Sequence, residues 1–234
     1  MSAEETKKIA DKINGHLSDK EGEFLYSTAK KCLGKGAIVE IGCWKGKSTV
    51  YLASGSKAGN NIKVYAIDPH QGTKDHQDNK ISNTLNDFKE NLKEAKVNDI
   101  VEPVVKTSQE AFRNWKEPVE FLWIDGDHSY EMVKLDFNLW SSYLVKGGII
   151  AFHDAVSGGP KKVVCNFVLK SNNFTDAGLI DSLFFAKKSD TLSLKDKIKN
   201  RAMIVLLDIY EFFREVHLPK SLRRLLKKIV VKIV

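Results

Sequence analysis

Short apolar runs alternate with stretches of helical spacing along most of the chain. Short runs dominated by apolar residues, typical of strands buried on both faces, occur at residues 37–41, 62–68, 100–105, 121–125 and 149–152. Between them apolar side chains recur every three or four positions, which predicts helices over residues 18–32, 48–54, 84–95, 131–144 and 161–171. Residues 174–180 and 183–186 are expected to form a closing pair of strands.

This alternation predicts an α/β fold with a Rossmann-like, mostly parallel sheet and helices on both faces. In such sheets ligands bind at the carboxyl ends of the strands. Four polar side chains stand where an apolar strand ends, namely Asp68, Asp125, His153 and Asp154. We therefore expect the functional site along that edge.

Beyond residue 190 the pattern changes to a tail divided at Pro219. Its first part carries an apolar helical stripe of Leu194, Ile198, Ala202, Val205, Ile209, Phe212 and Val216. The second part sets an aliphatic face against a basic face of Lys220, Arg223, Arg224, Lys227, Lys228 and Lys232. We expect a domain over residues 1–190 and a basic amphipathic tail over 191–234.

The charge distribution supports the division between residues 1–190 and the tail. The chain has 37 Lys and Arg against 30 Asp and Glu, a net charge of +7. Eleven of the basic and four of the acidic residues lie in 191–234, so the body holds 26 of each sign. A neutral body argues against a nucleic-acid partner. A polybasic amphipathic tail suits an anionic membrane surface; alternatively its stripe packs on the body or on a second subunit of a homo-oligomer.

Other totals place the chain among ordinary globular proteins. A hydrophobic fraction of 42% and a charged fraction of 29% are typical of a soluble domain. The three cysteines have no zinc spacing and are expected to be reduced, as in a cytoplasmic protein. We find neither a signal-peptide pattern nor an apolar run of about 20 residues, the length that a membrane span needs.

The loop after the first apolar strand is rich in glycine. It reads Glu40-Ile-Gly42-Cys-Trp44-Lys-Gly46-Lys-Ser48-Thr and opens a helix, a place where backbone can approach an anionic ligand. A P-loop requires four residues between its glycines. Here three residues separate them, so a nucleotide-hydrolysing protein remains only as the alternative function.

The second strand ends at Asp68, 26 positions after Gly42. An acid near this separation can accept hydrogen bonds from both ribose hydroxyls of a nucleoside cofactor. Without Asp68, the glycine loop could equally be a tight turn that binds no ligand.

The motifs VEIGCWKGKST, VYAIDPH, KTSQEAF, WIDGDHSYE and GGIIAFHDA together resemble class I S-adenosylmethionine-dependent methyltransferases. The resemblance covers roughly residues 18–186. More narrowly, the chain resembles metal-dependent O-methyltransferases of small molecules, such as macrolide-sugar and catechol enzymes. It implies S-adenosylmethionine as cofactor and a small-molecule, sugar or glycolipid hydroxyl as methyl acceptor. The cofactor residues that it implies are Glu40, Gly42, Trp44, Gly46, Ser48, Asp68, Ser108, Gln109 and Asp125.

Acidic and histidine side chains are concentrated in two segments. They are Asp125-Gly-Asp127-His128 and, after the next strand, His153-Asp154. The resemblance implies a divalent metal, Mg²⁺ or Mn²⁺, held by Asp125, His153 and Asp154. Family members usually place acids or an amide at these positions, and an imidazole favours Mn²⁺ over Mg²⁺. A hydrogen-bonded cluster without metal is the alternative.

His128 stands where the resembled family has a base that deprotonates the acceptor hydroxyl. Its imidazole has a suitable pKa for that role near neutrality. We therefore expect His128, together with Asp125, to be catalytic.

Several polar residues also have an ordinary structural interpretation. Asp127 is expected to cap the helix that follows it, and Asp136 is expected on the protein surface. His70 and His76 are expected as solvated residues of a polar loop rather than parts of a lid. For Ser108 a helix N-cap is as good an interpretation as an adenine contact, and Gln109 would then be a solvated neighbour.

The aromatic residues Trp44 and Tyr130 could stack on a ligand or fill the core. A third function class also stays open, a non-catalytic scaffold that keeps the cofactor fold and is recruited to membranes by its tail.

Overall fold

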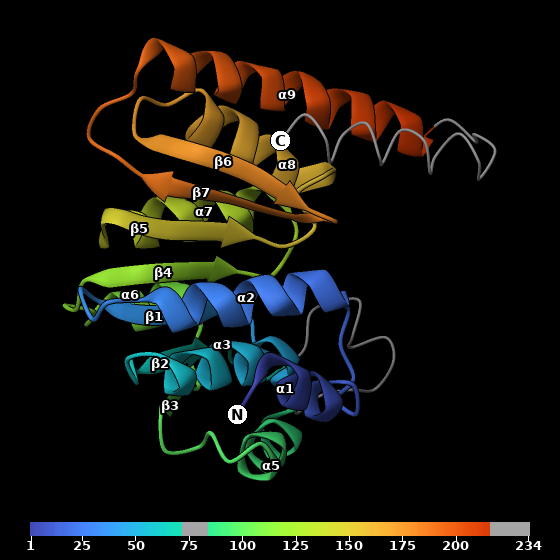
Figure 1. Ribbon diagram of the computed structural model, residues 1–234, viewed down its shortest axis with the longest axis vertical. Coiled ribbons are helices and arrows are strands. Elements are labelled where there is room, and N and C mark those ends of the chain that lie inside the picture. Colours follow the sequence, from blue (N-terminus) through green and yellow to red (C-terminus); the bar gives the residue numbers. More distant parts are fainter. Residues whose placement is uncertain (72–83, 216–234) are drawn as a thin grey trace.

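In a computed structural model, which describes residues 1–71 and 84–215, one twisted sheet runs through the molecule (Figure 1). The strand order is β3-β2-β1-β4-β5-β7-β6. The first five strands are parallel, while β7 is antiparallel to both of its neighbours. The strands are β1 (Ala37–Ile41), β2 (Val64–Ile67), β3 (Val101–Val104), β4 (Val119–Ile124), β5 (Leu144–Phe152), β6 (Phe174–Ile180) and β7 (Leu183–Lys188). The predicted fold class is confirmed.

Helices cover both faces of the sheet. They are α1 (Ala3–Ala10), α2 (Asp19–Lys31), α3 (Lys47–Ala58), α5 (Leu85–Glu94), α6 (Ser108–Phe112), α7 (Tyr130–Trp140), α8 (Gly158–Val163) and α9 (Leu194–Glu215). The predicted capping box is present, because Ser18 and Glu21 exchange side-chain to backbone hydrogen bonds at the start of α2. The predicted helix over 161–171 instead divides into α8 and the π-helical segment η1 (Val164–Leu169).

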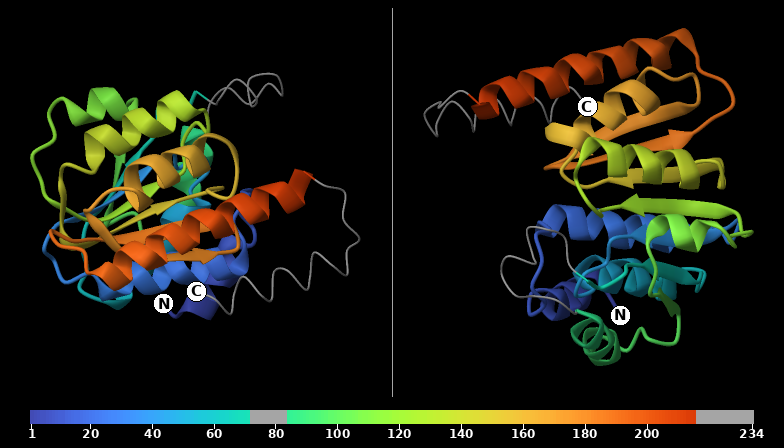
Figure 2. Two further views of the ribbon diagram at one scale, coloured as in Figure 1. Left: turned by 90° about the horizontal axis from the view of Figure 1, so that it is seen from above. Right: turned by 180° about the vertical axis from the view of Figure 1, so that it is seen from behind.

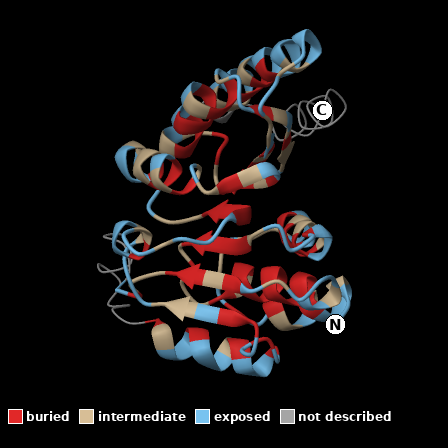
Figure 3. Ribbon diagram, turned by 90° about the vertical axis from the view of Figure 1, so that its left-hand side faces the viewer, coloured by how far each residue is buried: buried red, intermediate tan, exposed pale blue. Residues whose placement is uncertain are grey.

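Alternate residues of each central strand supply two separate cores. On β4, Phe121 and Trp123 point into the core under α1, α2 and α3, while Leu122 and Ile124 point into the core under α7 and α8. All four side chains are buried, and Figure 3 shows the strands as a buried layer between helices with exposed outer faces. This two-sided burial is why the strands are continuous apolar runs in the sequence.

Helix α9 packs across the edge of the sheet, and its C-terminal end points beyond the body (Figure 2). Its buried face consists of Met203, Leu206 and Leu207. The predicted apolar stripe is on the other face, where its members are exposed. The interpretation that this stripe packs on the body is therefore wrong for the described residues; its last member, Val216, and the segment after Pro219 lie outside them.

None of the described helices is long and apolar enough to cross a membrane. The three cysteines, Cys32, Cys43 and Cys165, are free and buried.

A close contact between two helices predicts a position that is sensitive to substitution. A Cβ added at Gly55 of α3 would lie 2.2 Å from the backbone oxygen of Tyr26 on α2, so the two helices would have to separate. We expect Gly55→Ala to lower the free energy of unfolding by about 2–3 kcal/mol, despite the better helix propensity of alanine. Urea denaturation measures this change. Lys20→Ala, an exposed control on α2, should change it by less than about 0.5 kcal/mol, and equal effects of the two substitutions would contradict the packing argument.

Candidate active site

The glycine loop joins β1 to α3 through three residues in the left-handed region, Gly42, Trp44 and Gly46. Gly42 has a φ of +82° and Gly46, the N-cap of α3, has a φ of +89°. An added Cβ at Gly42 would also lie 2.3 Å from the backbone oxygen of Asp125. A side chain is therefore excluded at Gly42 by conformation and by space, and the loop passes directly over the end of β4.

Glu40 lies beneath this loop rather than in the cavity above it. Its side chain is fully buried and accepts hydrogen bonds from the hydroxyls of Ser48 and Thr49 at the start of α3. Burial raises the pKa of Glu40 to about 8, against the opposing effect of the two hydroxyl donors. Glu40 thus holds the first turn of α3 against β1.

Asp68 connects the end of β2 to the glycine loop. Its Oδ2 accepts hydrogen bonds from the backbone N–H groups of Cys43 (2.9 Å) and Trp44 (2.8 Å). Its Oδ1 accepts from the N–H of His70 at 2.6 Å. The carboxylate is thereby oriented beside the loop, as the sequence spacing predicts, and helps to define the loop conformation.

His70 is buried, which contradicts its interpretation as a solvated loop residue. Its ring nitrogen Nδ1 lies 2.9 Å from the hydroxyl of Thr84, its Nε2 lies 3.8 Å from the sulfur of Cys43, and its ring packs on Phe88. Burial lowers the pKa of His70. The side chain thus joins the glycine loop to α5. His76 lies outside the described residues.

Asp136 is also buried, not on the surface as expected from the sequence. It accepts a hydrogen bond from the hydroxyl of Ser108, which in turn accepts one from the indole N–H of Trp140. Burial raises the pKa of Asp136 to about 6. The N-cap of α6 is Thr107, so the N-cap interpretation of Ser108 is wrong, and Gln109 is exposed beside it.

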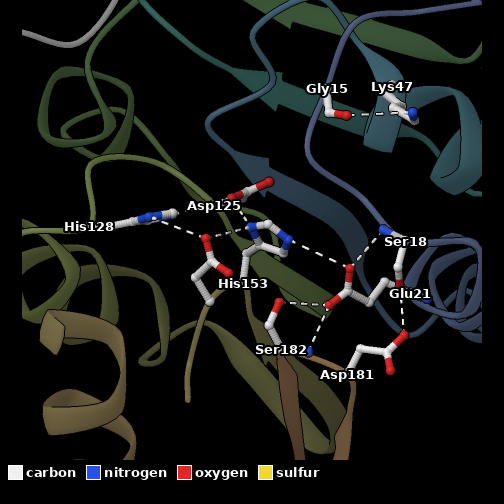
Figure 4. Close-up of polar contacts among 10 residues, drawn as sticks. Gly15, Ser18, Glu21, Lys47, Asp125, His128, His153, Asp181 and Ser182 are labelled. Atoms are coloured by element: carbon white, nitrogen blue, oxygen red, sulfur yellow. Dashed lines mark hydrogen bonds and ion pairs between the residues drawn. The ribbon is translucent and has the colours of Figure 1, made fainter. Parts of the chain in front are cut away.

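The predicted cluster of acids and histidines forms at the ends of β4 and β5 (Figure 4). The Nδ1 atom of His153 lies 3.0 Å from Oδ1 of Asp125 and 3.7 Å from Oδ2 of Asp154. His128 lies beside them, with Nε2 at 3.5 Å from Oδ1 of Asp125 and Nδ1 at 3.7 Å from Oδ2 of Asp154. His153 is buried, whereas the side chain of His128 is 42% exposed and accessible to an acceptor.

Glu21 completes the cluster and was not singled out as a site residue from the sequence. It comes from the first turn of α2, and its Oε2 lies 3.7 Å from Nε2 of His153 (Figure 4). Its Oε1 accepts hydrogen bonds from the N–H and the hydroxyl of Ser182 in the β6–β7 turn. The capping-box pattern explains Glu21 fully as a helix residue, so the sequence holds no signal for its second contact.

The charges of the cluster stabilise one another. Burial by itself disfavours a charged ring, yet the nearby carboxylates of Asp125 and Glu21 raise the pKa of His153 to about 11. Burial would raise the pKa of Glu21, but its contacts with His153, Ser18 and Ser182 lower it to about 2. The hydrogen bond with Asp125 raises the pKa of His128. His153 is thus an imidazolium between two carboxylates in the metal-free site.

Asp127 and Tyr130 have structural contacts next to this cluster. Asp127 accepts a hydrogen bond from the N–H of Ser129, the N-cap of α7, at 2.7 Å. The prediction that Asp127 caps this helix is therefore wrong, and its side chain instead orders the turn before it. Tyr130 packs against the core rather than lining the cavity.

One cavity of about 600 Å³ connects the two halves of the site. Its wall on one side is the glycine loop, with Gly42, Trp44 and Ser48, and on the other the cluster with Asp125 and His128. A segment that the sequence did not predict as part of the site, residues 14–17, forms a further wall. The cavity can therefore hold a cofactor on the loop and place a second molecule against the histidine.

A sequence profile of the family described as "Methyltransferase domain" matches residues 39–155, which is half of the chain and runs from β1 to the residues after β5. The chain belongs to this methyltransferase family. The predicted membership of a methyltransferase family and the predicted fold are confirmed. A P-loop nucleotide hydrolase, the alternative raised by Gly46-Lys47-Ser48, is therefore wrong.

Among curated proteins, the uncharacterized protein R132 of Acanthamoeba polyphaga mimivirus is 31% identical over 117 residues. The match covers 50% of this methyltransferase and 50% of the viral protein. The chain therefore spans about half the length of that relative.

Solved structures with the same fold include O-methyltransferases. The O-methyltransferase NovP superposes with a TM-score of 0.64 at 16% identity, over 75% of this chain and 83% of that chain. TomG from Streptomyces achromogenes, solved with S-adenosylmethionine, has a TM-score of 0.58 at 14% identity, over 80% and 89%. The O-methyltransferase from Bacillus cereus has a TM-score of 0.56 at 20% identity, over 80% and 90%.

The buried carboxyl of Glu40 predicts a pH-dependent stability. A folded-state pKa of about 8, above the ordinary glutamate value of 4.5, means that the unfolded chain loses its proton first as the pH rises. Glu40 therefore costs stability progressively between pH 4.5 and 8. We expect the stability of Glu40→Gln relative to the wild type to increase over this range, by on the order of 1 kcal/mol per pH unit. Chemical denaturation at a series of pH values measures it, and a difference that is constant with pH would contradict the assignment.

Proposed function

We propose that this methyltransferase transfers the methyl group of S-adenosylmethionine to a hydroxyl group of a sugar or another small molecule. The observation that carries the proposal is the shared cavity, since Gly42 and Ser48 line it together with His128. A cofactor bound along the glycine loop would thus have an imidazole within the same enclosed space, where the acceptor hydroxyl must lie.

In this proposal His128 is the general base. Its exposed ring lies between Asp125 and Asp154, whose carboxylates stabilise the imidazolium that forms when the ring takes up a proton. The acceptor oxygen attacks the methyl carbon as its proton passes to His128. The new O–CH₃ bond forms while the S–CH₃ bond breaks, and the sulfonium becomes the neutral thioether of S-adenosylhomocysteine.

The residues of the cluster also fit a divalent metal, the second cofactor that the resemblance implies. Nδ1 of His153 lies 3.0 Å from an oxygen of Asp125 and 3.7 Å from an oxygen of Asp154. The ligand atoms of Asp125, His128 and His153 all lie within 4.8 Å of one another. Glu21 faces the other nitrogen of His153, in the way that carboxylates commonly orient a histidine ligand. A metal bound there would lower the pKa of the acceptor hydroxyl. In the metal-free site the proton on His153 balances the same carboxylates.

The cofactor proposal predicts that Asp68 contributes strongly to binding. Asp68→Ala removes the carboxylate that would bind the ribose and that holds two backbone N–H groups of the loop. We expect the wild type to bind S-adenosylmethionine in isothermal titration calorimetry, and Asp68→Ala to bind at least about tenfold more weakly. Asp99→Ala on the surface should bind like the wild type. Absence of heat for the wild type at high micromolar cofactor would refute the proposal.

The base proposal predicts a loss of turnover without a loss of cofactor affinity. His128→Ala should lower kcat by about 10²–10⁴, measured as transfer of labelled methyl to an acceptor found by screening sugars and catechols. Because His128 must be neutral to accept a proton and its pKa is raised, wild-type kcat should increase with pH through a midpoint above 6.5. His16→Ala, at an exposed histidine on another wall of the cavity, is the matched control. Full turnover of His128→Ala would exclude the base role, and cofactor binding without transfer to any acceptor would favour the scaffold alternative.

A further inference from the structure

Helix α9 is apolar on two opposite faces, and the sheet edge covers only one of them. The covered face carries Met203, Leu206 and Leu207. On the other face Leu194, Ile198 and Phe212 are 75%, 60% and 60% exposed. We call the exposed side chains the α9 stripe: Leu194, Ile198, Val205, Ile209 and Phe212. An exposed row of large apolar side chains along a single helix marks an interaction surface.

Basic residues border the α9 stripe. Lys195 and Arg201 fall on its two sides at 3.6 residues per turn, and both are exposed, as are Lys197 and Lys199. Long basic side chains beside an apolar stripe can extend their charged ends to lipid headgroups while the stripe enters the apolar layer. The N-terminal half of α9 therefore has the composition of a helix that lies on an anionic surface.

Two acids in the C-terminal half of α9, Asp208 and Glu211, pair with a lysine of the body. The ammonium group of Lys161, on α8, lies 2.7 Å from Asp208 and 2.5 Å from Glu211. Glu211 also accepts a hydrogen bond from the N–H of Gly158 at 3.3 Å. These contacts fix α9 to the segment after β5. Because Lys161 offsets the negative charge of both acids, they repel an anionic partner less than the sequence suggests.

The sequence that follows the described part of α9 extends the positive charge. Residues 216–234 contain six Lys and Arg and no Asp or Glu, whereas residues 1–190 are neutral. A second copy of the chain would bring these two like-charged segments together, and their repulsion disfavours a dimer through this face. Anionic phospholipid headgroups instead complement the charge. We propose that the α9 stripe and its basic border dock this protein on an anionic phospholipid membrane.

This docking is independent of methyl transfer, so the two proposals can fail separately. Docking would also hold the acid–histidine cluster close to the lipid. Glu211, next to Phe212 of the stripe, accepts a hydrogen bond from Gly158, and Gly158 is only four residues after Asp154 of the cluster.

Vesicle co-sedimentation of the full-length protein tests the proposal. The wild type should sediment with vesicles of phosphatidylcholine containing about 30% phosphatidylserine at about 0.1 M salt, and much less with pure phosphatidylcholine or at about 0.5 M salt. Ile198→Ser/Val205→Ser/Ile209→Ser should weaken binding at least about tenfold. These side chains are exposed, so the fold is retained, as circular dichroism can check.

Two further variants separate the contributions of the stripe and of the charge. The control Leu33→Ser/Val105→Ser/Met132→Ser removes three exposed apolar side chains from the body and should bind vesicles like the wild type. Lys195→Glu/Arg201→Glu should weaken binding to anionic vesicles. Wild-type protein that stays in the supernatant with anionic vesicles would overturn the proposal. So would a dimer, seen by light scattering without lipid, that the triple α9 variant dissociates, because the stripe would then bind a second copy.

Discussion

The close approach of two backbone segments at Gly42 determines the geometry of the whole site. The loop after β1 crosses the end of β4 where only a glycine fits, with no room for a Cβ beside the carbonyl of Asp125. Backbone hydrogen bonds continue the pairing past the strands, from the N–H of Asp125 to the carbonyl of Ile41. This contact places the glycine loop, which would hold the cofactor, and the acid–histidine cluster around a single cavity. The chemistry proposed for the protein depends on that proximity.

A second constraint is electrostatic. His153 has a carboxylate at each ring nitrogen, one from the end of β4 and one from α2. Burial disfavours the charged form of both carboxylates, and the protonated ring between them is one of the contacts that offset this cost. The ion pairs of His153 thus join the first turn of α2 to the end of β4. They also leave the more exposed His128 as the histidine that faces an incoming molecule.

The sequence predicts the strands, the capping box of α2 and the residues at the strand ends, because each depends on local pattern and on the parallel topology. It fails for His70 and Asp136, since polar residues in polar segments look solvated until their partners are known. Those partners, Thr84 and Ser108, are 14 and 28 residues away in the sequence. Glu21 is the same case, because its local role conceals its contact with the site. Helical spacing in the sequence predicts the residues of the α9 stripe. Spacing alone does not say which of the two apolar faces of the helix packs on the body.

The contacts of Glu21 also have a consequence for local opening. The first turn of a helix usually frays readily, with amide hydrogens that exchange far faster than those of the core. Here the carboxylate that caps the first turn of α2 also binds the β6–β7 turn at Ser182 and faces His153. Unwinding that turn would break contacts to two other parts of the chain and leave a buried imidazolium with one carboxylate fewer. The beginning of α2 should therefore exchange its amide hydrogens together with the catalytic edge, as one cooperative unit.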